Sequence, residues 1–113
     1  MRLFERTPNI DAAGAAELLA TRSALLVDVR QPAEWTAGHI DGTLHIPLSQ
    51  LSRRLDELPQ HQTIVTICRS GHRSALAART LSRAGHNVLN LKGGINAWTR
   101  AGLPLRPAKK HKK

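Results

Sequence analysis

The 113-residue chain has few aromatic residues and a single cysteine. Two tryptophans, one phenylalanine and no tyrosine give 3% aromatic residues, while hydrophobic residues of all kinds reach 41%. The core must therefore be built from Leu, Ile, Val and Ala, which is typical of an ordinary folded domain rather than of disorder. One cysteine excludes an internal disulfide, and it excludes a second thiol that could resolve an oxidised first one. No apolar run approaches the length of a membrane span, so a membrane partner is not expected.

Positive charge is in excess, with 17 Lys and Arg against 8 Asp and Glu and a net charge of +9. The last five residues hold four lysines, Lys109, Lys110, Lys112 and Lys113. We predict one domain over residues 1–106 and a basic, disordered tail over residues 107–113, whose solvation is a simpler interpretation than a binding role. The remaining arginines are scattered and lack the interleaved aromatic residues of a nucleic-acid interface, so nucleic acid is not the expected partner.

The first residues carry charges at Arg2, Glu5 and Arg6 and contain no apolar stretch of the kind found in secretory signals. We therefore expect a cytoplasmic, reducing location, in which a free thiol stays available. We expect a monomer whose basic surface helps to attract small anionic substrates.

Short apolar runs alternate with helical patterns along the chain, which is typical of an α/β domain with a largely parallel sheet. The run TIVTI at 63–67 is almost wholly β-branched and does not alternate, so both faces of this strand should be buried. A helix is predicted from Ser49 to Leu58, because Leu51, Leu55 and Leu58 share one helical face and Pro59 ends it. The other predicted elements are helices at 12–20 (capped by Asp11), 32–38, 74–84 and within 93–102, and strands at 24–29, within 43–48 and at 87–91.

The sequence CRSGHRS at 68–74 places the only cysteine between a predicted strand and a predicted helix. In open α/β sheets, this carboxyl edge is where ligands bind. Backbone amides that converge at a helix N-terminus favour a thiolate, which lowers the pKa of the thiol and makes the sulfur a nucleophile. Gly71 allows the loop to curl around the sulfur, and Arg69 and Arg73 supply charge for an anionic substrate. Because its neighbours in the loop are polar, we expect Cys68 to be reactive and unburied rather than a small buried hydrophobe.

The histidines show no metal-ligand spacing with the cysteine or with one another, so neither a metal nor another cofactor is predicted. His72 could act as a base, but exposure to solvent is the simpler interpretation. Trp98 is expected to pack in the core rather than to contact a cofactor. The remaining histidines are His39, His45, His61, His86 and His111.

Four segments together resemble a rhodanese-like domain of the small, single-domain sulfurtransferase type. The match runs from about Ile10 to Pro104, and the order and spacing of the segments make it specific. The segments are LLVDVRQPAEW at 25–35, AGHIDGTLHIPL at 37–48, CRSGHRS at 68–74 and GGINAW at 93–98.

The resemblance implies a five-stranded, mostly parallel sheet flanked by helices. It also implies that Cys68 accepts a sulfane sulfur atom as a persulfide from an anionic donor such as thiosulfate, and passes it to a thiol or to cyanide. This chemistry is reasonable in itself, since a thiolate that attacks a sulfur–sulfur bond can release sulfite as an anion. With no second cysteine, an external thiol or protein thiol must discharge the persulfide. The residues implied to cradle the persulfide and hold the donor are Arg69, Ser70, Gly71, His72, Arg73 and Ser74.

The resemblance also gives Asp28 and Arg30 a role in supporting this loop, although an ordinary surface ion pair is an equally good interpretation. Glu34, Gly38 and His39 match the E-x-x-x-G-H pattern of the family and are expected to be structural.

Loop length separates two related chemistries. Cysteine-dependent phosphatases use C-x5-R because a tetrahedral phosphate needs a wide cradle, whereas the C-x4-R between Cys68 and Arg73 suits a single sulfur atom. The sequence therefore favours sulfur transfer over phosphoryl chemistry. The main alternative is a non-catalytic rhodanese-like module that binds or regulates a partner, although such a module would need neither the cysteine nor the complete loop. Nucleic-acid binding through the basic tail is a further alternative.

Overall fold

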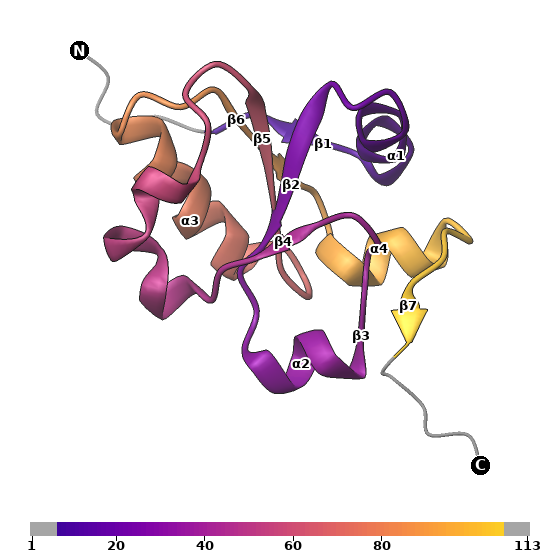
Figure 1. Cartoon of the computed structure of the whole chain (residues 1–113). Helices are drawn as coiled ribbons and strands as arrows, with labels where there is room; N and C mark the ends of the chain where they lie inside the picture. The colour runs from indigo at the N-terminus through magenta and orange to yellow at the C-terminus, as the bar shows by residue number, and fades with distance from the viewer. Residues whose placement is uncertain (1–6, 108–113) are drawn as a thin grey trace.

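The computed structural model describes residues 7–107 and has a five-stranded sheet at its centre. Neighbouring strands all run parallel, in the order β1-β6-β5-β2-β4, so that β5 occupies the middle position (Figure 1). A separate antiparallel pair joins β3 (Gly38–His39) to β7 (Arg106–Pro107). The expected α/β fold with a parallel sheet is thus confirmed. The strands of the main sheet are β1 (Asn9–Ile10), β2 (Ala24–Asp28), β4 (Leu44–His45), β5 (Thr63–Ile67) and β6 (Val88–Leu91).

Helices cover both faces of this sheet, as Figure 1 shows. On one face lie α1 (Ala12–Ala20) and α4 (Gly94–Arg100), and on the other lies α3 (His72–Arg83) with the 3₁₀ helices η1 (Leu48–Arg53) and η2 (Leu55–Glu57). The short helix α2 (Pro32–Ala37) lies beyond the carboxyl end of β2. The domain therefore has three layers, and the carboxyl ends of its strands open toward α2.

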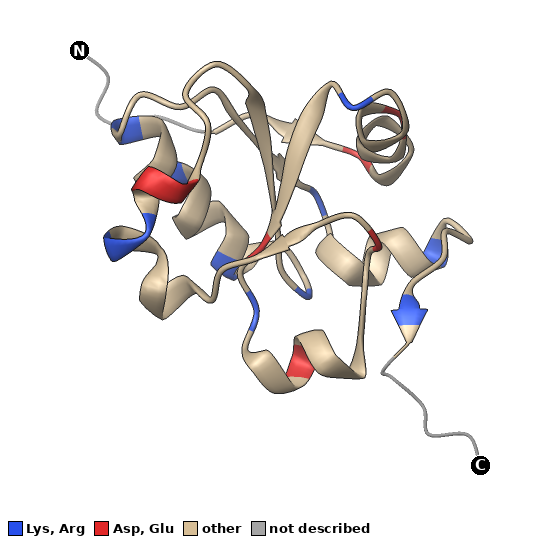
Figure 2. Ribbon diagram, in the orientation of Figure 1, with Lys and Arg blue, Asp and Glu red and all other residues tan. Residues whose placement is uncertain are grey.

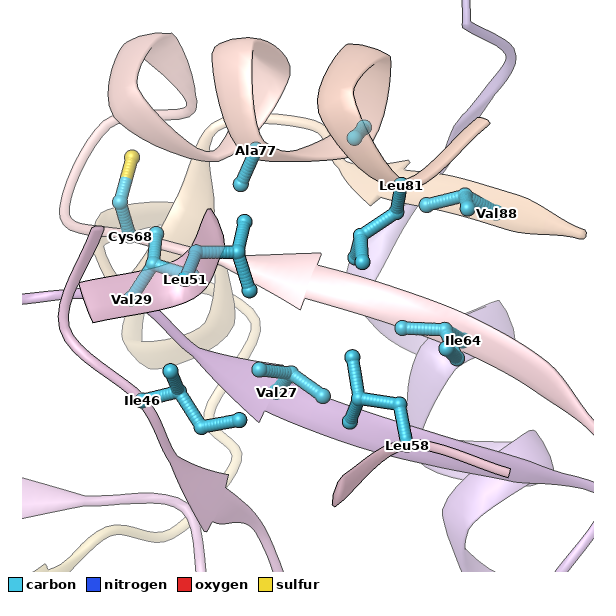
Figure 3. Packing of buried hydrophobic residues seen from close by; sticks show 11 residues of the cluster. Val27, Val29, Ile46, Leu51, Leu58, Ile64, Cys68, Ala77, Leu81 and Val88 are labelled. Atoms are coloured by element: carbon cyan, nitrogen blue, oxygen red, sulfur yellow. The ribbon is translucent and has the colours of Figure 1, made fainter. Parts of the chain in front are cut away.

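The central strand β5 contributes to two hydrophobic cores, one on each face of the sheet. Ile64 and Cys68 belong to the core under α3, whereas Val65 and Ile67 belong to the core under α1 and α4. Side chains alternate between faces along a strand, which confirms that both faces of TIVTI are buried. Full burial of a residue such as Leu81 contributes about 1.5–3 kcal/mol. Figure 3 shows the α3-side core, which consists of Val27, Val29, Ile46, Leu51, Leu58, Ile64, Cys68, Ala77, Ala78, Leu81 and Val88.

The predicted helix from Ser49 to Leu58 is wrong, because this segment forms η1 and η2 instead. Arg54 interrupts it with a backbone conformation outside the helical region (φ −121°, ψ 20°). The turns close through bonds between residues three apart, such as the Arg54 amide to the Leu51 carbonyl at 3.0 Å. Leu51 and Leu58 are still buried against the sheet. Packing of these leucines thus governs the segment more than helical periodicity does.

Other boundaries differ by one or two residues from the sequence prediction, and two examples lie near Cys68. Helix α3 begins at His72 rather than at Ser74, because Gly71 adopts a left-handed conformation (φ 105°) at its N-cap. His72 and Arg73 therefore belong to the first turn of the helix. Strand β2 ends one residue earlier than predicted, at Asp28.

Pro107 is the last described residue, and the rest of the predicted tail lies outside the described residues, as do the charges at positions 2, 5 and 6. Over residues 7–107, none of the helices has the length and apolar character that crossing a membrane requires.

Candidate active site around Cys68

Cys68 directly follows the central strand β5 and is completely buried, with a relative exposure of 0%. The prediction that polar neighbours keep it unburied is wrong. Its sulfur lies on the α3 side of the sheet, because Cys68 continues the alternation of β5 with Ile64 on the same face. Figure 3 shows the sulfur beneath the first turns of α3. The polar side chains of Arg69 and Ser70 point to solvent instead, so loop polarity and thiol burial coexist.

The buried sulfur is a hydrogen-bond acceptor, unlike that of a cysteine in an apolar core. The backbone amide of Gly71 donates to Sγ at 3.0 Å, and the Ser74 hydroxyl lies at 3.3 Å. Burial raises the pKa of the Cys68 thiol. Hydrogen bonds from the Ser74 hydroxyl and from the amides of Ser74, Gly71 and Ser70 lower this pKa by more than burial raises it. The pKa therefore lies below its ordinary value. Donors aimed at one sulfur stabilise a thiolate, which is the nucleophilic form of cysteine.

Residues 68–74, the active loop, are held in shape by the N-terminus of α4. The amide of Ile95 donates to the Cys68 carbonyl at 2.9 Å, and the amide of Asn96 donates to the Arg69 carbonyl at 3.1 Å. A Cβ on Gly94 would collide with these same two carbonyl oxygens, and Gly94 also has a positive φ of 58°. The close approach requires glycine. The first peptide groups of the loop are thus fixed from outside.

Asn90 on β6 joins the active loop through its side-chain amide and was missed by the sequence analysis. Its Oδ1 accepts the Ser74 hydroxyl at 2.6 Å, and its Nδ2 donates to the Gly71 carbonyl at 3.3 Å. The Ser74 hydroxyl has one proton and two acceptors, Asn90 Oδ1 and Cys68 Sγ, which therefore compete for it. The signal in the sequence was a polar residue inside the apolar strand VLNL, because a buried amide needs partners.

The resemblance implied that Arg73 helps to hold the sulfur donor, but in the structure its guanidinium is already bound. Both of its terminal nitrogens bind the Glu34 carboxylate, at 2.7 Å and 2.9 Å. The hydrogen bond from Arg73 is the main reason that the pKa of Glu34 falls to about 2, and the amide of Gln31 also lowers it. This forked pair joins α3 to α2 across 39 residues of sequence. Glu34 is therefore a structural tie to the active loop, and Arg69 is the loop arginine that stays exposed.

Asp28 and Arg30 form a buried ion pair rather than a surface one. Arg30 Nη2 lies 2.9 Å from Asp28 Oδ2, and both residues are at most 5% exposed. The same guanidinium donates to the Gly38 carbonyl at 2.8 Å. Asp28 is in register with Ile67, the residue before Cys68, so the pair lies at the strand end beside the active loop. The surface interpretation is wrong, and a role in supporting the loop stays a prediction.

Several aromatic and histidine side chains of the described region have structural contacts. Trp98 is buried and donates from Nε1 to the Pro104 carbonyl at 2.8 Å, which confirms its packing role. The rings of His39 and His45 stack on Trp35, with centroids 3.6 Å and 4.7 Å away. His72 is exposed, and its Nδ1 lies 3.2 Å from the Ser70 hydroxyl. Within residues 7–107, no group of three or more His, Cys, Asp or Glu side chains has an arrangement that could hold a metal ion.

Comparisons with known proteins agree on one family. The family model described as "Rhodanese-like domain" matches residues 11–101. A sulfurtransferase of Allochromatium vinosum is 44% identical over 99 residues, which cover 86% of this chain and 92% of that protein.

Solved structures give the same result. A rhodanese-related protein from Thermoplasma volcanium superposes with a TM-score of 0.82 at 33% identity, covering 88% of this chain and 97% of that one. A thiosulfate sulfurtransferase from Pseudomonas aeruginosa gives a TM-score of 0.82 at 29% identity over 91% of this chain, which spans 20% of that longer protein. The parallel sheet, the match to the family model and these likenesses together show that the chain belongs to the rhodanese-like domain family.

Proposed function

We propose that the protein is a sulfurtransferase that carries sulfane sulfur on Cys68. The observation that carries the proposal is the pair of donors on the buried sulfur, the Gly71 amide and the Ser74 hydroxyl, with the resulting fall in the pKa of the thiol. Likeness to a sulfurtransferase over nearly the whole of both chains supports it. Such a thiolate suits attack on a sulfur–sulfur bond, in which sulfur is both the electrophile and the atom transferred.

The proposed cycle has two steps. The Cys68 thiolate attacks the outer sulfur of a small anionic donor such as thiosulfate. A Cys68–sulfur bond forms, the donor's sulfur–sulfur bond breaks, and sulfite leaves with the bonding electrons. An acceptor then attacks the terminal sulfur and regenerates the Cys68 thiolate; cyanide leaves as thiocyanate, and a thiol leaves as a persulfide. The chain has no second cysteine, so the acceptor thiol must come from another molecule.

In this proposal, the residues of the active loop have different tasks. The amides of residues 70, 71 and 74 hold the charge of the sulfur, and the Ser74 hydroxyl adds a further donor. Arg69 is exposed and supplies charge for the anionic donor, while Arg73 acts by holding α2 against the loop through Glu34. Because Cys68 is fully buried, the donor reaches the sulfur only when side chains around the loop move.

Intact-protein mass spectrometry after mixing with thiosulfate tests the proposal, with Cys68→Ser as the matched control. A gain of about 32 Da on the wild type alone, removed by cyanide or dithiothreitol, is the expected signature of a persulfide. A gain only with a low-molecular-weight persulfide donor would retain sulfur transfer and replace thiosulfate as the donor. No gain with either donor, while Cys68 remains reduced, would reject the cycle.

The second candidate is a rhodanese-like module that binds a partner without catalysis. Complete burial of Cys68 and occupation of Arg73 by Glu34 favour it, because both restrict access of an anionic donor to the sulfur. The same experiment separates the two functions, since a binding module gains no sulfur mass.

A further inference from the structure

Acidic and basic residues are segregated along the chain. All Asp and Glu residues lie within the first 57 positions, and none follows Glu57, whereas eleven of the 17 Lys and Arg residues lie after it. The active loop, α3 and α4 all belong to this acid-free part. Figure 2 shows basic positions spaced along α3 and no acidic position on that helix.

The exposed side of α3 next to the active loop combines charge with an apolar residue. His72, Leu76 and Arg79 follow one another at spacings of four and three, so they lie on one stripe of the helix, and all three are exposed. Leu76 is 53% exposed, and it is the one large hydrophobic residue across residues 7–107 whose side chain lies mainly in solvent. The fold thus leaves a leucine exposed to solvent between His72 and Arg79, close to the loop that holds Cys68.

The two carboxylates described above beside the active loop do not neutralise the charge of this surface. Glu34 is committed to Arg73, and Asp28 is buried with Arg30. Lys92 directly follows β6 and is exposed. The next residue, Gly93, packs closely against Gly71, since a Cβ built on Gly71 would lie 3.3 Å from the Gly93 amide nitrogen. Lys92 therefore lies beside the active loop. The docking face is defined as Arg69, His72, Leu76, Arg79 and Lys92.

We propose that the docking face binds an acidic protein that carries the thiol to which Cys68 passes its sulfur. This proposal rests on the sulfurtransferase function. The positive face complements negative charge and would speed encounter with an acidic partner. Leu76 supplies the apolar anchor that the centre of a protein interface needs. From residue 72 to residue 79 the stripe is about 10 Å long, which exceeds the reach of a small thiol.

A protein fits this face better than a nucleic acid does. Base stacking needs exposed aromatic rings, yet Trp98 is buried, and Trp35 is stacked against two histidines. The acceptor must also supply a thiol, which an unmodified nucleic acid lacks. In the transfer, the partner's thiolate attacks the terminal sulfur of the protonated Cys68 persulfide. The sulfur–sulfur bond breaks, the terminal sulfur moves to the partner with its proton, and Cys68 leaves as the thiolate.

Two synthetic peptides of equal length test the docking face. One contains glutamates, one leucine and one cysteine, and the other has every glutamate replaced by glutamine. The rate at which each peptide discharges the Cys68 persulfide is followed by mass spectrometry, with cyanide as the small reference acceptor. We expect the acidic peptide to react roughly tenfold faster at low ionic strength, and this advantage to shrink in about 0.5 M salt, where charges are screened.

Variants then locate the effect on α3. Leu76→Ser combined with Arg79→Gln should remove most of the advantage of the acidic peptide and leave discharge by cyanide unchanged. The matched control is Arg83→Gln, which removes the same charge farther along α3 and should keep the advantage. Equal rates for the two peptides, or a double variant that behaves like the wild type, would overturn the proposal.

Binding without sulfur transfer separates this proposal from the catalytic one. Fluorescence anisotropy of the acidic peptide, labelled and with its thiol alkylated, reports docking even if no persulfide ever forms. Binding that the double variant weakens supports the docking face, and its absence rejects it. Tighter binding of a single-stranded oligouridylate than of the acidic peptide would also reject it, in favour of a nucleic-acid surface.

Discussion

Replacement of Ser74 by alanine should raise the pKa of the Cys68 thiol. The change removes the hydroxyl that lies 3.3 Å from Sγ and leaves the Gly71 amide at 3.0 Å in place. A hydrogen bond to a charged group contributes about 1.5–3 kcal/mol, and the long distance favours the lower end of that range. A loss of about 1.5 kcal/mol corresponds to roughly a tenfold smaller acid dissociation constant of the thiol.

Asn90→Ala should have the opposite effect on the same pKa. Asn90 Oδ1 takes the Ser74 proton at 2.6 Å, so its removal leaves the sulfur as the remaining acceptor of that hydroxyl. The thiolate gains a donor and its pKa falls further. The variant also loses the bond from Asn90 Nδ2 to the Gly71 carbonyl, so stability must be measured separately.

Thiolate absorbance near 240 nm, recorded as a function of pH, measures both variants without needing a reagent to reach the buried sulfur. Ser70→Ala is the control, because the Ser70 hydroxyl contacts exposed His72. The titration midpoint should move up for Ser74→Ala, move down for Asn90→Ala and stay in place for the control. Midpoints that move in the same direction for Ser74→Ala and Asn90→Ala would refute competition for one proton.

Three further changes test the surroundings of the loop. Gly94→Ala should lower the free energy of unfolding by more than about 3 kcal/mol, because a Cβ at this position meets backbone carbonyls. The control Gly102→Ala has open space around it and should lower the free energy of unfolding by about 1 kcal/mol. Urea unfolding compares the two variants. Glu34→Gln should cost about 1 kcal/mol at pH 7. Since the pKa of Glu34 is lowered to about 2 from 4.5, this stabilisation is present above pH 4.5 and is lost as the pH falls toward 2. The unfolding free energies of wild type and variant should therefore converge in acid. A difference in unfolding free energy that persists at pH 2 would contradict its assignment to the Arg73 pair. Leu81→Ala should cost about 2–5 kcal/mol because its side chain is fully buried, and a loss below 1 kcal/mol in thermal unfolding would show that the α3-side core is not packed as described.

The sequence was sufficient for the features that depend on local pattern. The β-branched run of β5 required a buried strand, and the change from strand to helix around Cys68 located this cysteine at the carboxyl edge of the sheet. Gly71 was rightly assigned an unusual backbone conformation, with φ 105°. Such signals are contained within a few consecutive residues, so no knowledge of the tertiary fold is needed.

Features that depend on contacts between distant segments could not be predicted from the sequence. Glu34 and Arg73 are far apart in sequence, and their pairing depends on how α2 lies against α3. Burial of Cys68 follows from the helix that covers it, although its polar neighbours suggested exposure. In the sequence, Asn90 is only a polar residue within an apolar strand. Its contact with the active loop becomes evident only from the pairing of β6 with β5. Local polarity predicts exposure poorly wherever side chains alternate between a core and solvent.

The order of strands in the sheet has a consequence for folding of the protein. Strand β1, from the start of the domain, pairs only with β6, near its end, and Asn9 Oδ1 accepts a bond from the Asn90 amide. The side-chain amide of Asn90, which accepts the Ser74 proton, is thus oriented in part by Asn9, a residue 81 positions earlier in the chain. Closing so long a loop is entropically costly and slow. The surroundings of the Cys68 sulfur, including the Asn90 amide that accepts from Ser74, are therefore complete only after segments near both ends of the domain have come together.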